Sequence, residues 1–439
     1  MKQFEKRLAN KGSQIRACRK FFQIVEKPKT DLEILAQKSM LENMSYQLPE
    51  SAKHDRLIGL KELWRSFKDS TDEKWAPTST PRLILDGRND KEILRKEYTQ
   101  SIYKKEFSFV SRDALRSNQG NVSNPIKVWV LLKGLKDGVK VFFFEENRVN
   151  IALKHRSIRE LLSLISLLER NGVEEVHDFN QYEIDSNVYY LVVKEVFGGA
   201  LKIYKYPSPG PLYLHNSILL TDTIALNHGY HAEEIKQLPD IKYNELKMVP
   251  PEGYYQYAAS YKDTHRSPEV DVGFYSHAGW IRMSEGHADD GLGIADLEIE
   301  LLEKLRHVIT HNGSSISLKI FLHPREKEAF DESIVHYKAI FGDEVSIEFS
   351  NVDEPSTKAF DQVRIGIGVY STILFERLVL GRPTLIYGGT DRFPIRGSKL
   401  NNIFCDQDNL ADQLLNGLEL DQTSFFASNE IEYMRLPNA

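Results

Sequence analysis

The sequence has very few cysteines, no long apolar run and no large excess of either charge. Its 439 residues include two cysteines, Cys18 and Cys405, which excludes a disulfide framework or a thiolate metal site and makes the cytoplasm the expected location. No run approaches the roughly 18 consecutive apolar residues of a membrane span, and an N-terminus without an apolar core predicts no signal peptide. With a net charge of −6, we expect no attraction to nucleic acid.

The first twenty residues are basic, in contrast to the whole chain. Glu5 is their sole acidic residue, against Lys2, Lys6, Arg7, Lys11, Arg16, Arg19 and Lys20. Interleaved apolar residues would let this segment lie on an anionic membrane. We favour a solvated helical arm packed on its own protein, and keep peripheral contact with the inner face of the cytoplasmic membrane as the alternative.

The length and the breaks in composition predict two domains and an extension. A chain of 439 residues exceeds the usual size of a single core, and the run Ala76–Pro81 is rich in residues that end helices. The predicted segments are a helical N-terminal extension at 1–80, a Rossmann-like domain at 81–240, an interdomain linker at 241–268 and a second Rossmann-like domain at 269–439.

Short apolar runs alternate with amphipathic stretches on both sides of the linker. In the first half we predict a helix at 157–170 and strands at 82–85, 128–132, 139–144 and 188–193. In the second half we predict strands at 270–276, 317–322, 345–349, 364–369 and 384–387, and helices at 294–309, 326–341 and 372–380. This alternation predicts an α/β fold with parallel sheets, which bind ligands beyond the carboxyl ends of their strands.

Two polar pairs lie at such strand ends in the second half. His323-Pro324 follows strand 317–322 and Ser371-Thr372 follows strand 364–369, each directly before a helix. Free N–H groups at a helix N-terminus favour a phosphate, so both pairs are candidates for binding one. The alternatives are a structural turn at His-Pro and a simple N-cap at Ser371 or Thr372.

Carboxylates and one serine complete the candidates at the same edge. Glu354 follows strand 345–349 and could accept both hydroxyls of a ribose, or be merely solvated. Ser276 ends the first strand of this half. Asp289 and Asp290 lie in the loop before helix 294–309, where they are either catalytic or favourable to the helix dipole.

These motifs resemble those of bacterial GT-B glycosyltransferases that use CMP-activated acid sugars, namely sialyltransferases, polysialyltransferases and Kdo transferases. The matching residues are His323, Pro324, Ser371 and Thr372, which the resemblance assigns to the CMP phosphate, with Glu354 on the ribose. Asp289-Asp290-Gly291 resembles the acidic motif of the sialyltransferases, although its place shortly before His-Pro is nearer to certain Kdo transferases. The resemblance covers roughly residues 270–400 and implies a GT-B-like fold of two Rossmann-like domains facing a central cleft.

The function implied is transfer of a Kdo or sialic acid type sugar from a CMP-sugar donor to a cell-surface glycan or glycolipid acceptor. Asp290 or Asp289 would be nucleophile or base, and His323 the stabiliser or general acid. Retention and inversion both stay open. The alternatives are another donor (a UDP-sugar, a GDP-sugar or a CDP-alcohol) and a non-catalytic binding or scaffold protein of the same fold.

The first half is expected to bind the acceptor. Glu145 and Glu146 follow the run 141–144 and are acceptor-side candidates for an acid or base, or else solvated loop residues. His228 and His231 have a spacing that could suit a metal, but no further ligands accompany them. We therefore expect neither a metal nor a cofactor besides the donor substrate.

Overall fold

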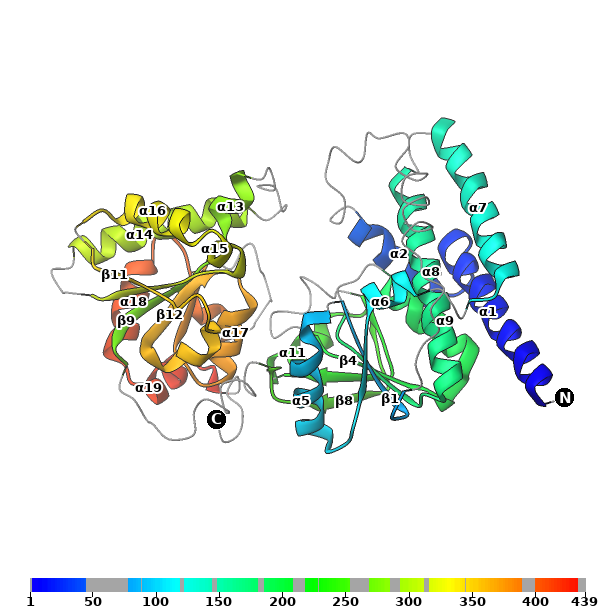
Figure 1. Cartoon of the computed structure of the whole chain (residues 1–439). Helices are drawn as coiled ribbons and strands as arrows, with labels where there is room; N and C mark the ends of the chain where they lie inside the picture. Colours follow the sequence, from blue (N-terminus) through cyan, green and yellow to red (C-terminus); the bar gives the residue numbers. More distant parts are fainter. Residues whose placement is uncertain are drawn as a thin grey trace. The chain divides into compact units, whose positions relative to one another are not determined.

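The computed structural model describes thirteen stretches of the chain, which divide into two compact units. The stretches are 2–44, 78–87, 89–118, 122–143, 148–180, 185–207, 218–227, 229–252, 268–284, 293–311, 316–343, 345–388 and 399–432. The N-terminal unit comprises 1–207, 212–226 and 235–247, and the C-terminal unit comprises 208–211, 227–234 and 248–439. Figure 1 shows a sheet with flanking helices in each unit.

A six-stranded sheet forms the base of the N-terminal unit. Its order is β2-β1-β3-β4-β6-β8, and the pairs from β2 through β6 are parallel. Counted in chain order the first five strands read 2-1-3-4-5, a doubly wound arrangement. The strands are β1 (Arg82–Asp86), β2 (Ser108–Ser111), β3 (Glu175–Asp178), β4 (Lys202–Lys205), β6 (Thr223–Leu226) and β8 (Glu245–Met248), and β5 (Leu219–Leu220) pairs with β7 (Ile241–Lys242).

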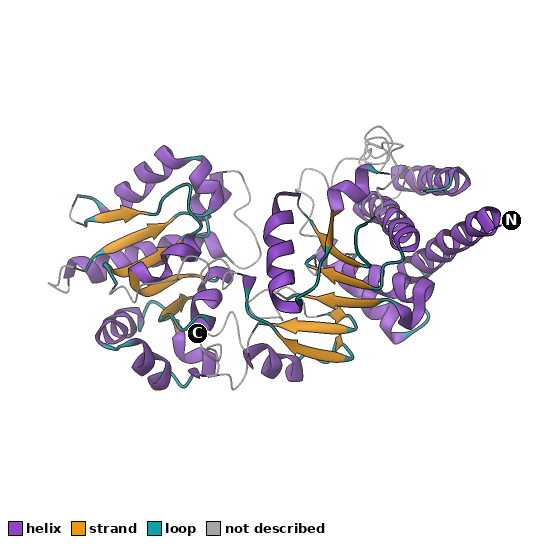
Figure 2. Ribbon diagram, turned by 60° about the horizontal axis from the view of Figure 1, so that its bottom comes forward, coloured by secondary structure: helices purple, strands orange, loops and turns teal. Residues whose placement is uncertain are grey.

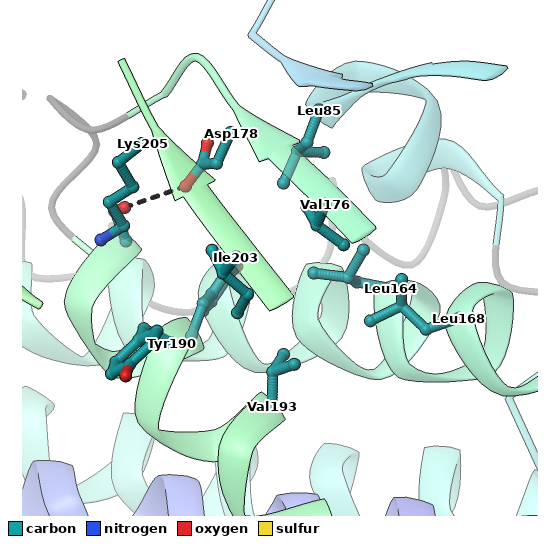
Figure 3. Close-up of a pocket in the computed structure, with 11 residues that line it drawn as sticks. Leu85, Leu164, Leu168, Val176, Asp178, Tyr190, Val193, Ile203 and Lys205 are labelled. Carbon is teal, nitrogen blue, oxygen red and sulfur yellow. Dashed lines mark hydrogen bonds between the residues drawn. The ribbon is translucent and has the colours of Figure 1, made fainter. Parts of the chain in front are cut away.

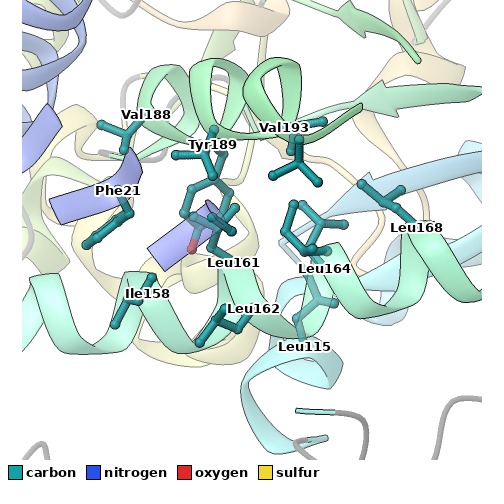
Figure 4. Close-up of a cluster of buried hydrophobic side chains, with 14 of the residues drawn as sticks. Phe21, Leu115, Ile158, Leu161, Leu162, Leu164, Leu168, Val188, Tyr189 and Val193 are labelled. Atoms are coloured by element: carbon teal, nitrogen blue, oxygen red, sulfur yellow. The ribbon is translucent and has the colours of Figure 1, made fainter. Parts of the chain in front are cut away.

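The helices of this unit pack their apolar faces together in its core. In Figure 4, leucines of α8 (Arg148–Asn171) meet Tyr189 and Val193 of α9 (Ser186–Phe197), and Phe21 of α1 (Lys2–Glu26) lies beside them. Apolar residues three and four apart on α8 give it one continuous buried face. The other helical elements are α2 (Asp31–Met44), η1 (Asn89–Lys91), α5 (Glu92–Tyr103), α6 (Arg112–Ser117), α7 (Asn124–Phe143), η3 (Gly198–Ala200) and α11 (Gly229–Gln237).

Three strands predicted for this half are wrong. Residues 128–132 lie in α7, and so do 139–143 of the run 139–144, whose last residue is outside the described ones. The run 188–193 lies in α9, where Val188, Val192 and Val196 are buried at helical spacing. A short continuous apolar run looks the same in a buried strand and in a helix.

The C-terminal unit contains a six-stranded sheet in which every neighbouring pair is parallel. Its order, β11-β10-β9-β12-β13-β14, reads 3-2-1-4-5-6 in chain order, the arrangement of dinucleotide-binding domains. The strands are β9 (Val270–Tyr275), β10 (Leu318–Phe321), β11 (Ile347–Phe349), β12 (Val363–Val369), β13 (Thr384–Tyr387) and β14 (Phe404–Cys405).

Helices lie on both faces of this sheet, as Figure 2 shows. They are α13 (Gly279–Ser284), α14 (Ile294–His311), α15 (Pro324–Glu328), α16 (Phe330–Phe341), η4 (Ser356–Gln362), α17 (Thr372–Val379), η5 (Lys399–Ile403), α18 (Leu410–Glu419) and α19 (Gln422–Ser428). The single helix predicted at 326–341 is divided at Ala329 into α15 and α16.

The expected α/β class, with two Rossmann-like units and N-terminal helices, is confirmed by these two sheets. The predicted domain limits stay predictions. Residues 253–267 of the predicted linker lie outside the described residues, and β7 and β8 fall within its first part.

Two glycines let β12 pack closely at the centre of the C-terminal unit. A Cβ on Gly368 would lie 2.6 Å from the carbonyl oxygen of Tyr275, and one on Gly366 would lie 2.5 Å from Nε of Arg377. The Arg377 guanidinium is fully buried and donates to the Tyr275 hydroxyl and the Phe360 carbonyl, both at 2.9 Å. A side chain at Gly368 would therefore push β12 away from the end of β9, and one at Gly366 would displace the buried guanidinium.

We expect Gly368→Ala to destabilise the C-terminal unit by about 1–3 kcal/mol, because the added methyl meets backbone that cannot move aside cheaply. Gly199→Ala is the control, since nothing lies within 4 Å of its added Cβ. Denaturant unfolding of both variants measures the difference, and equal stability of the two would contradict the close approach of β12 to β9.

Candidate functional site

Three loops of the C-terminal unit leave the same edge of the sheet. Strands β9, β10 and β12 are adjacent and parallel, with Tyr275 paired to Phe321 and Phe274 to Ile367. The chain leaves β9 and β12 toward opposite sides in the 3-2-1-4-5-6 order, which opens a crevice at their carboxyl ends. His323 and Ser371 follow β10 and β12, so the predicted pairs do come to this edge.

His323 is held with one ring nitrogen pointing back into its own loop. It is the N-cap of α15, and its Nδ1 accepts the N–H of Arg325 at 3.3 Å. The proton of the neutral ring is therefore on Nε2, which is a hydrogen-bond donor. Pro324 occupies the first helical position, where its fixed φ suits the helix and its missing N–H costs nothing.

The surroundings of His323 are positively charged. Its ring lies over that of His277, with centroids 6.2 Å apart. Burial, and after it the nearby His277, Arg282 and Arg325, lower the pKa of His323 to about 4. At neutral pH the imidazole is thus an uncharged donor among groups that attract an anion.

Ser371 leaves the first turn of α17 uncapped. It occupies the N-cap position with extended dihedral angles (φ −143°, ψ 142°), but its side chain makes no capping hydrogen bond. The first N–H groups of a helix have no acceptor within the helix. Thr372, the first helical residue, is exposed. Ser371 thus occupies the N-cap position of the alternative interpretation without making its hydrogen bond, and the arrangement can present amides and hydroxyls to a phosphate.

Two buried glutamates, which sequence reasoning missed, hold the loops after β9 and β10. Glu298 of α14 accepts the N–H groups of His277 at 2.5 Å and Gly279 at 2.9 Å. Glu326 of α15 accepts the N–H of His323 at 2.9 Å and the indole N–H of Trp280 at 2.8 Å.

A sequence signal existed for each of these glutamates. Glu326 is the N3 residue of a capping box whose N-cap is His323. Glu298 lies on the apolar face of α14, between Leu297 and Leu301.

Burial raises the pKa of both carboxyl groups. For Glu298 it reaches about 7, with the neighbouring Glu326 as the second cause, while hydrogen bonds from His277, Gly279 and Ser276 oppose the rise. The pKa of Glu326 is also raised by burial. Glu298 is therefore divided between its two protonation states near neutral pH.

Ser276 serves the loop in which it lies. Its Oγ accepts the N–H of Ala278 at 2.9 Å and lies 3.4 Å from Glu298 Oε1, to which it donates. Ala278 has φ 59°, a left-handed conformation that costs a non-glycine residue about 1 kcal/mol or more. The predicted contact of Ser276 with the nucleotide-sugar donor stays a prediction.

Glu354 lies farther along the same edge. Its side chain is exposed, in the loop after β11. The amine of Lys327 fixes that loop by donating to the carbonyls of Asn351 at 3.1 Å and Glu354 at 2.6 Å. Since β11 is two strands from β9, the loop starts about 10 Å from the β9 end.

Four candidates lie outside the described residues: Asp289, Asp290, Glu145 and Glu146. His228 also lies outside them, and the side chain of His231 is not described. Among the described residues there is no group of three or more histidines, cysteines or carboxylates that could hold a metal ion. Nor does the described part contain a helix long and apolar enough to cross a membrane.

At the N-terminal unit's sheet, the edge where the strands have their carboxyl ends is occupied by buried charged side chains. Arg112, directly after β2, donates to Asp185 at 2.5 Å and to Glu160 at 3.0 Å, and all three are buried. Lys205 at the end of β4 donates to Asn187 at 3.0 Å. Burial lowers the pKa of Lys205 to about 8.

A cavity of about 20 Å³ lies beside Asp178 and Lys205 in this unit. Figure 3 shows these polar side chains at one end of it and Leu164, Leu168 and Val176 at the other. That volume suits about one water molecule, so the cavity is no substrate site.

Comparison with known proteins finds similarity to solved structures alone. No family model matches the chain, and no curated protein matches it. Among solved structures, it is similar to the UDP-GlcNAc 2-epimerase of Neisseria meningitidis bound to UDP-GlcNAc, with 11% identity and a TM-score of 0.43 over 80% of this chain and 95% of that one.

Two further structures are similar at the same level. HepE of Anabaena in complex with UDP and glucose has 7% identity and a TM-score of 0.38, over 80% of this chain and 95% of that one. The UDP-GlcNAc 2-epimerase of Methanocaldococcus jannaschii has 9% identity and a TM-score of 0.41, over 78% and 92%. Values this low carry no conclusion about substrate or reaction.

We expect Glu298→Gln to change how stability depends on pH. In the wild type the pKa of Glu298 is higher in the folded state (about 7) than in the unfolded state (roughly 4.3). The raised pKa therefore adds its full contribution to the free energy of unfolding below about pH 4.3, the pKa of the unfolded state. That contribution is lost as the pH rises toward 7. Glutamine has no such loss, so the stability deficit of the variant should shrink between pH 5 and 8 by on the order of 2–3 kcal/mol.

Amide hydrogen exchange of peptides from β9 and β12 would follow this unit alone. The opposite pH dependence that His323 contributes is present in both proteins and cancels in their difference. Glu303→Gln, an exposed position of the same helix, is the control and should give a constant difference. A deficit for Glu298→Gln that stays constant from pH 5 to 8 would rule out a raised pKa at Glu298.

Proposed function

We propose that the chain is a glycosyltransferase whose C-terminal unit binds a nucleotide-activated sugar. The observation that carries the proposal is that two groups able to bind a phosphate lie at one edge of the sheet, after β10 and β12, which lie to either side of β9. These are the uncharged Nε2 donor of His323 and the uncapped N-terminus of α17 with the Ser371 hydroxyl. Both lie beside the β9–β12 crevice of a nucleotide-binding strand order.

The charge at this edge suits departure of a nucleotide. When the bond between sugar and phosphate breaks, negative charge develops on the phosphate oxygen and positive charge on the sugar carbon. His323 would donate a hydrogen bond to that oxygen as a neutral imidazole, and the first N–H groups of α17 would donate to the other phosphate oxygens. With a pKa of about 4 in the free protein, His323 acts here as a stabiliser rather than as a charged acid.

The sugar carbon needs a carboxylate partner, for which Asp290 and Asp289 stay the candidates. As nucleophile, one of them would form a covalent intermediate and the reaction would retain configuration. As base, it would take the proton of the acceptor hydroxyl and the reaction would invert. The acceptor, proposed to be a glycan or glycolipid, would then meet Glu145 and Glu146 of the N-terminal unit.

The finer proposal is a CMP-activated acid sugar of the Kdo or sialic acid type. It is supported by the motifs His323-Pro324 and Ser371-Thr372, and it would place the ribose on Glu354. The second candidate is another donor, namely a UDP-sugar, a GDP-sugar or a CDP-alcohol. This candidate remains because the contacts argued above involve the phosphate, which all these donors share. None of them involves the nucleobase, which would distinguish one donor from another.

A panel of CMP, UMP, GMP, CDP and UDP tests the proposal by thermal stabilisation. A ligand at about 100 times its dissociation constant should stabilise the protein by about 2.7 kcal/mol. We expect a shift with CMP that is reduced in His323→Ala and Ser371→Ala and unchanged in His311→Ala, an exposed histidine of α14. A shift with UDP or GDP alone would move the proposal to the second candidate. No shift with any nucleotide would leave the scaffold alternative.

The ionisation of His323 provides an independent test. In the free protein we expect its imidazole to titrate near pH 4 with the proton on Nε2. Saturation with the nucleotide should move the midpoint upward, because a phosphate favours the imidazolium form. NMR of ¹⁵N-labelled histidine, assigned with His323→Ala, measures both. A free-state midpoint near 6.5 would contradict the burial argument, and an unmoved midpoint would contradict the phosphate contact.

A further inference from the structure

Helix α7 of the N-terminal unit exposes apolar side chains where a surface helix normally has polar ones. Val128, Leu132 and Leu135, at spacings of four and three residues, are 53%, 59% and 43% exposed. Trp129 beside them is 44% exposed. The opposite side of α7, with Ile126 and Val130 buried, faces α8, and Figure 1 shows α7 beside α8 along the outside of this unit's helices. The side turned away from α8 is therefore an apolar stripe, defined by Val128, Leu132 and Leu135.

The charges of α7 are lysines at the margins of this stripe. Lys127, Lys133 and Lys136 lie on the helix. Lys133 pairs with Glu26 of α1 at 2.9 Å, and its amine lies 4.5 Å from the ring centre of Phe22, whereas Lys136 is exposed. Its one acidic residue, Asp137, is buried on the α8 side, 3.6 Å from His155. Beside the stripe, the described part of α7 therefore exposes the positive charge of Lys136 and no acidic side chain of its own.

A soluble helix buries such a stripe against its own protein, and a transmembrane helix would have no lysines along it. An apolar face with a tryptophan, bordered by lysines, is the pattern of a helix that lies in the plane of an anionic lipid surface. The lysine stems can extend along the apolar face while their amines stay at the headgroups.

We propose that α7 is a peripheral membrane-binding element, with Val128, Leu132 and Leu135 inserted at the headgroup boundary of an anionic bilayer. The proposal adds α7 to the basic residues of α1 as a candidate membrane-binding surface. Two of those residues are engaged within the unit: Lys20 pairs with Glu33 at 2.6 Å, and Arg16 donates to the carbonyl of Val196 at 3.5 Å. The proposal is independent of the reaction and of the donor.

Flotation of the full chain with vesicles tests this proposal. We expect binding to phosphatidylcholine vesicles that contain about 30% phosphatidylglycerol, an anionic lipid that attracts lysines, and much weaker binding to pure phosphatidylcholine. The double variant Val128→Asp/Leu132→Asp should bind at least about tenfold more weakly, because each replaced side chain loses the free energy of leaving water. Lys136→Glu should weaken binding by about fivefold or more, and most strongly at low salt.

The controls are apolar positions that are even more exposed. Ile93 on α5 is 73% exposed and Val335 on α16 is 68% exposed, so Ile93→Asp and Val335→Asp remove exposed apolar area elsewhere and should bind like the wild type. Leu132→Ile should also keep binding. Circular dichroism and nucleotide stabilisation check that each variant is folded.

Three outcomes would overturn the proposal. The first is no vesicle binding by the wild type, and the second is binding that α7 variants and controls lose equally. The third is concentration-dependent self-association, seen by light scattering without lipid and abolished by Leu132→Asp, which would make a second copy of the chain the occupant of the stripe.

Discussion

Two buried carboxylates fix the geometry on which the rest of the candidate site depends. Glu298 and Glu326 accept backbone N–H groups from the loops after β9 and β10, and such charge-assisted hydrogen bonds contribute about 1.5–3 kcal/mol each. Burying two neighbouring carboxylates opposes this gain, which is why their pKa values are raised. Ser276 lies against both, so the two loops form one network. The orientation of His323 therefore depends on the buried carboxylates that hold its loop.

The two units use the same edge of a parallel sheet in opposite ways. In the C-terminal unit the carboxylates lie beneath the loops, and the groups that point outward are neutral or positively charged. In the N-terminal unit the edge itself is occupied by Arg112 with Asp185 and Glu160, whose charges satisfy one another. Buried pairs of this kind are costly to break but do not bind a partner. Among the described residues of that unit, Arg112, Asp185 and Glu160 are therefore not expected to contact an acceptor.

Much of the C-terminal unit could be predicted from the sequence because local and tertiary signals coincide there. Its strands are short apolar runs between amphipathic helices, and the strand-end rule led directly to His323 and Ser371. The supporting residues could not be found in this way. Glu298 lies 21 residues from His277 and Glu326 lies 46 residues from Trp280, so their pairing depends on how α14 and α15 pack. Equally, sequence alone could not distinguish a capping Ser371 from an uncapped one, because the difference is a rotamer.

The misprediction of α7 as strands and its exposed stripe have the same physical origin. A surface helix is recognised by polar residues on one side, and α7 lacks that side because Val128, Leu132 and Leu135 face away from α8. The rule that a surface helix alternates apolar and polar faces therefore predicts strands at 128–132 and 139–144 instead of a helix. Apolar exposure of this kind costs free energy in water and persists only if something else is gained. The proposed contact with a lipid surface would supply that gain, and it would also concentrate the proposed transferase near a lipid-linked acceptor. The apolar pattern of α7 does not fit a helix exposed to water, and sequence features that break the local rules in this way often mark a functional surface.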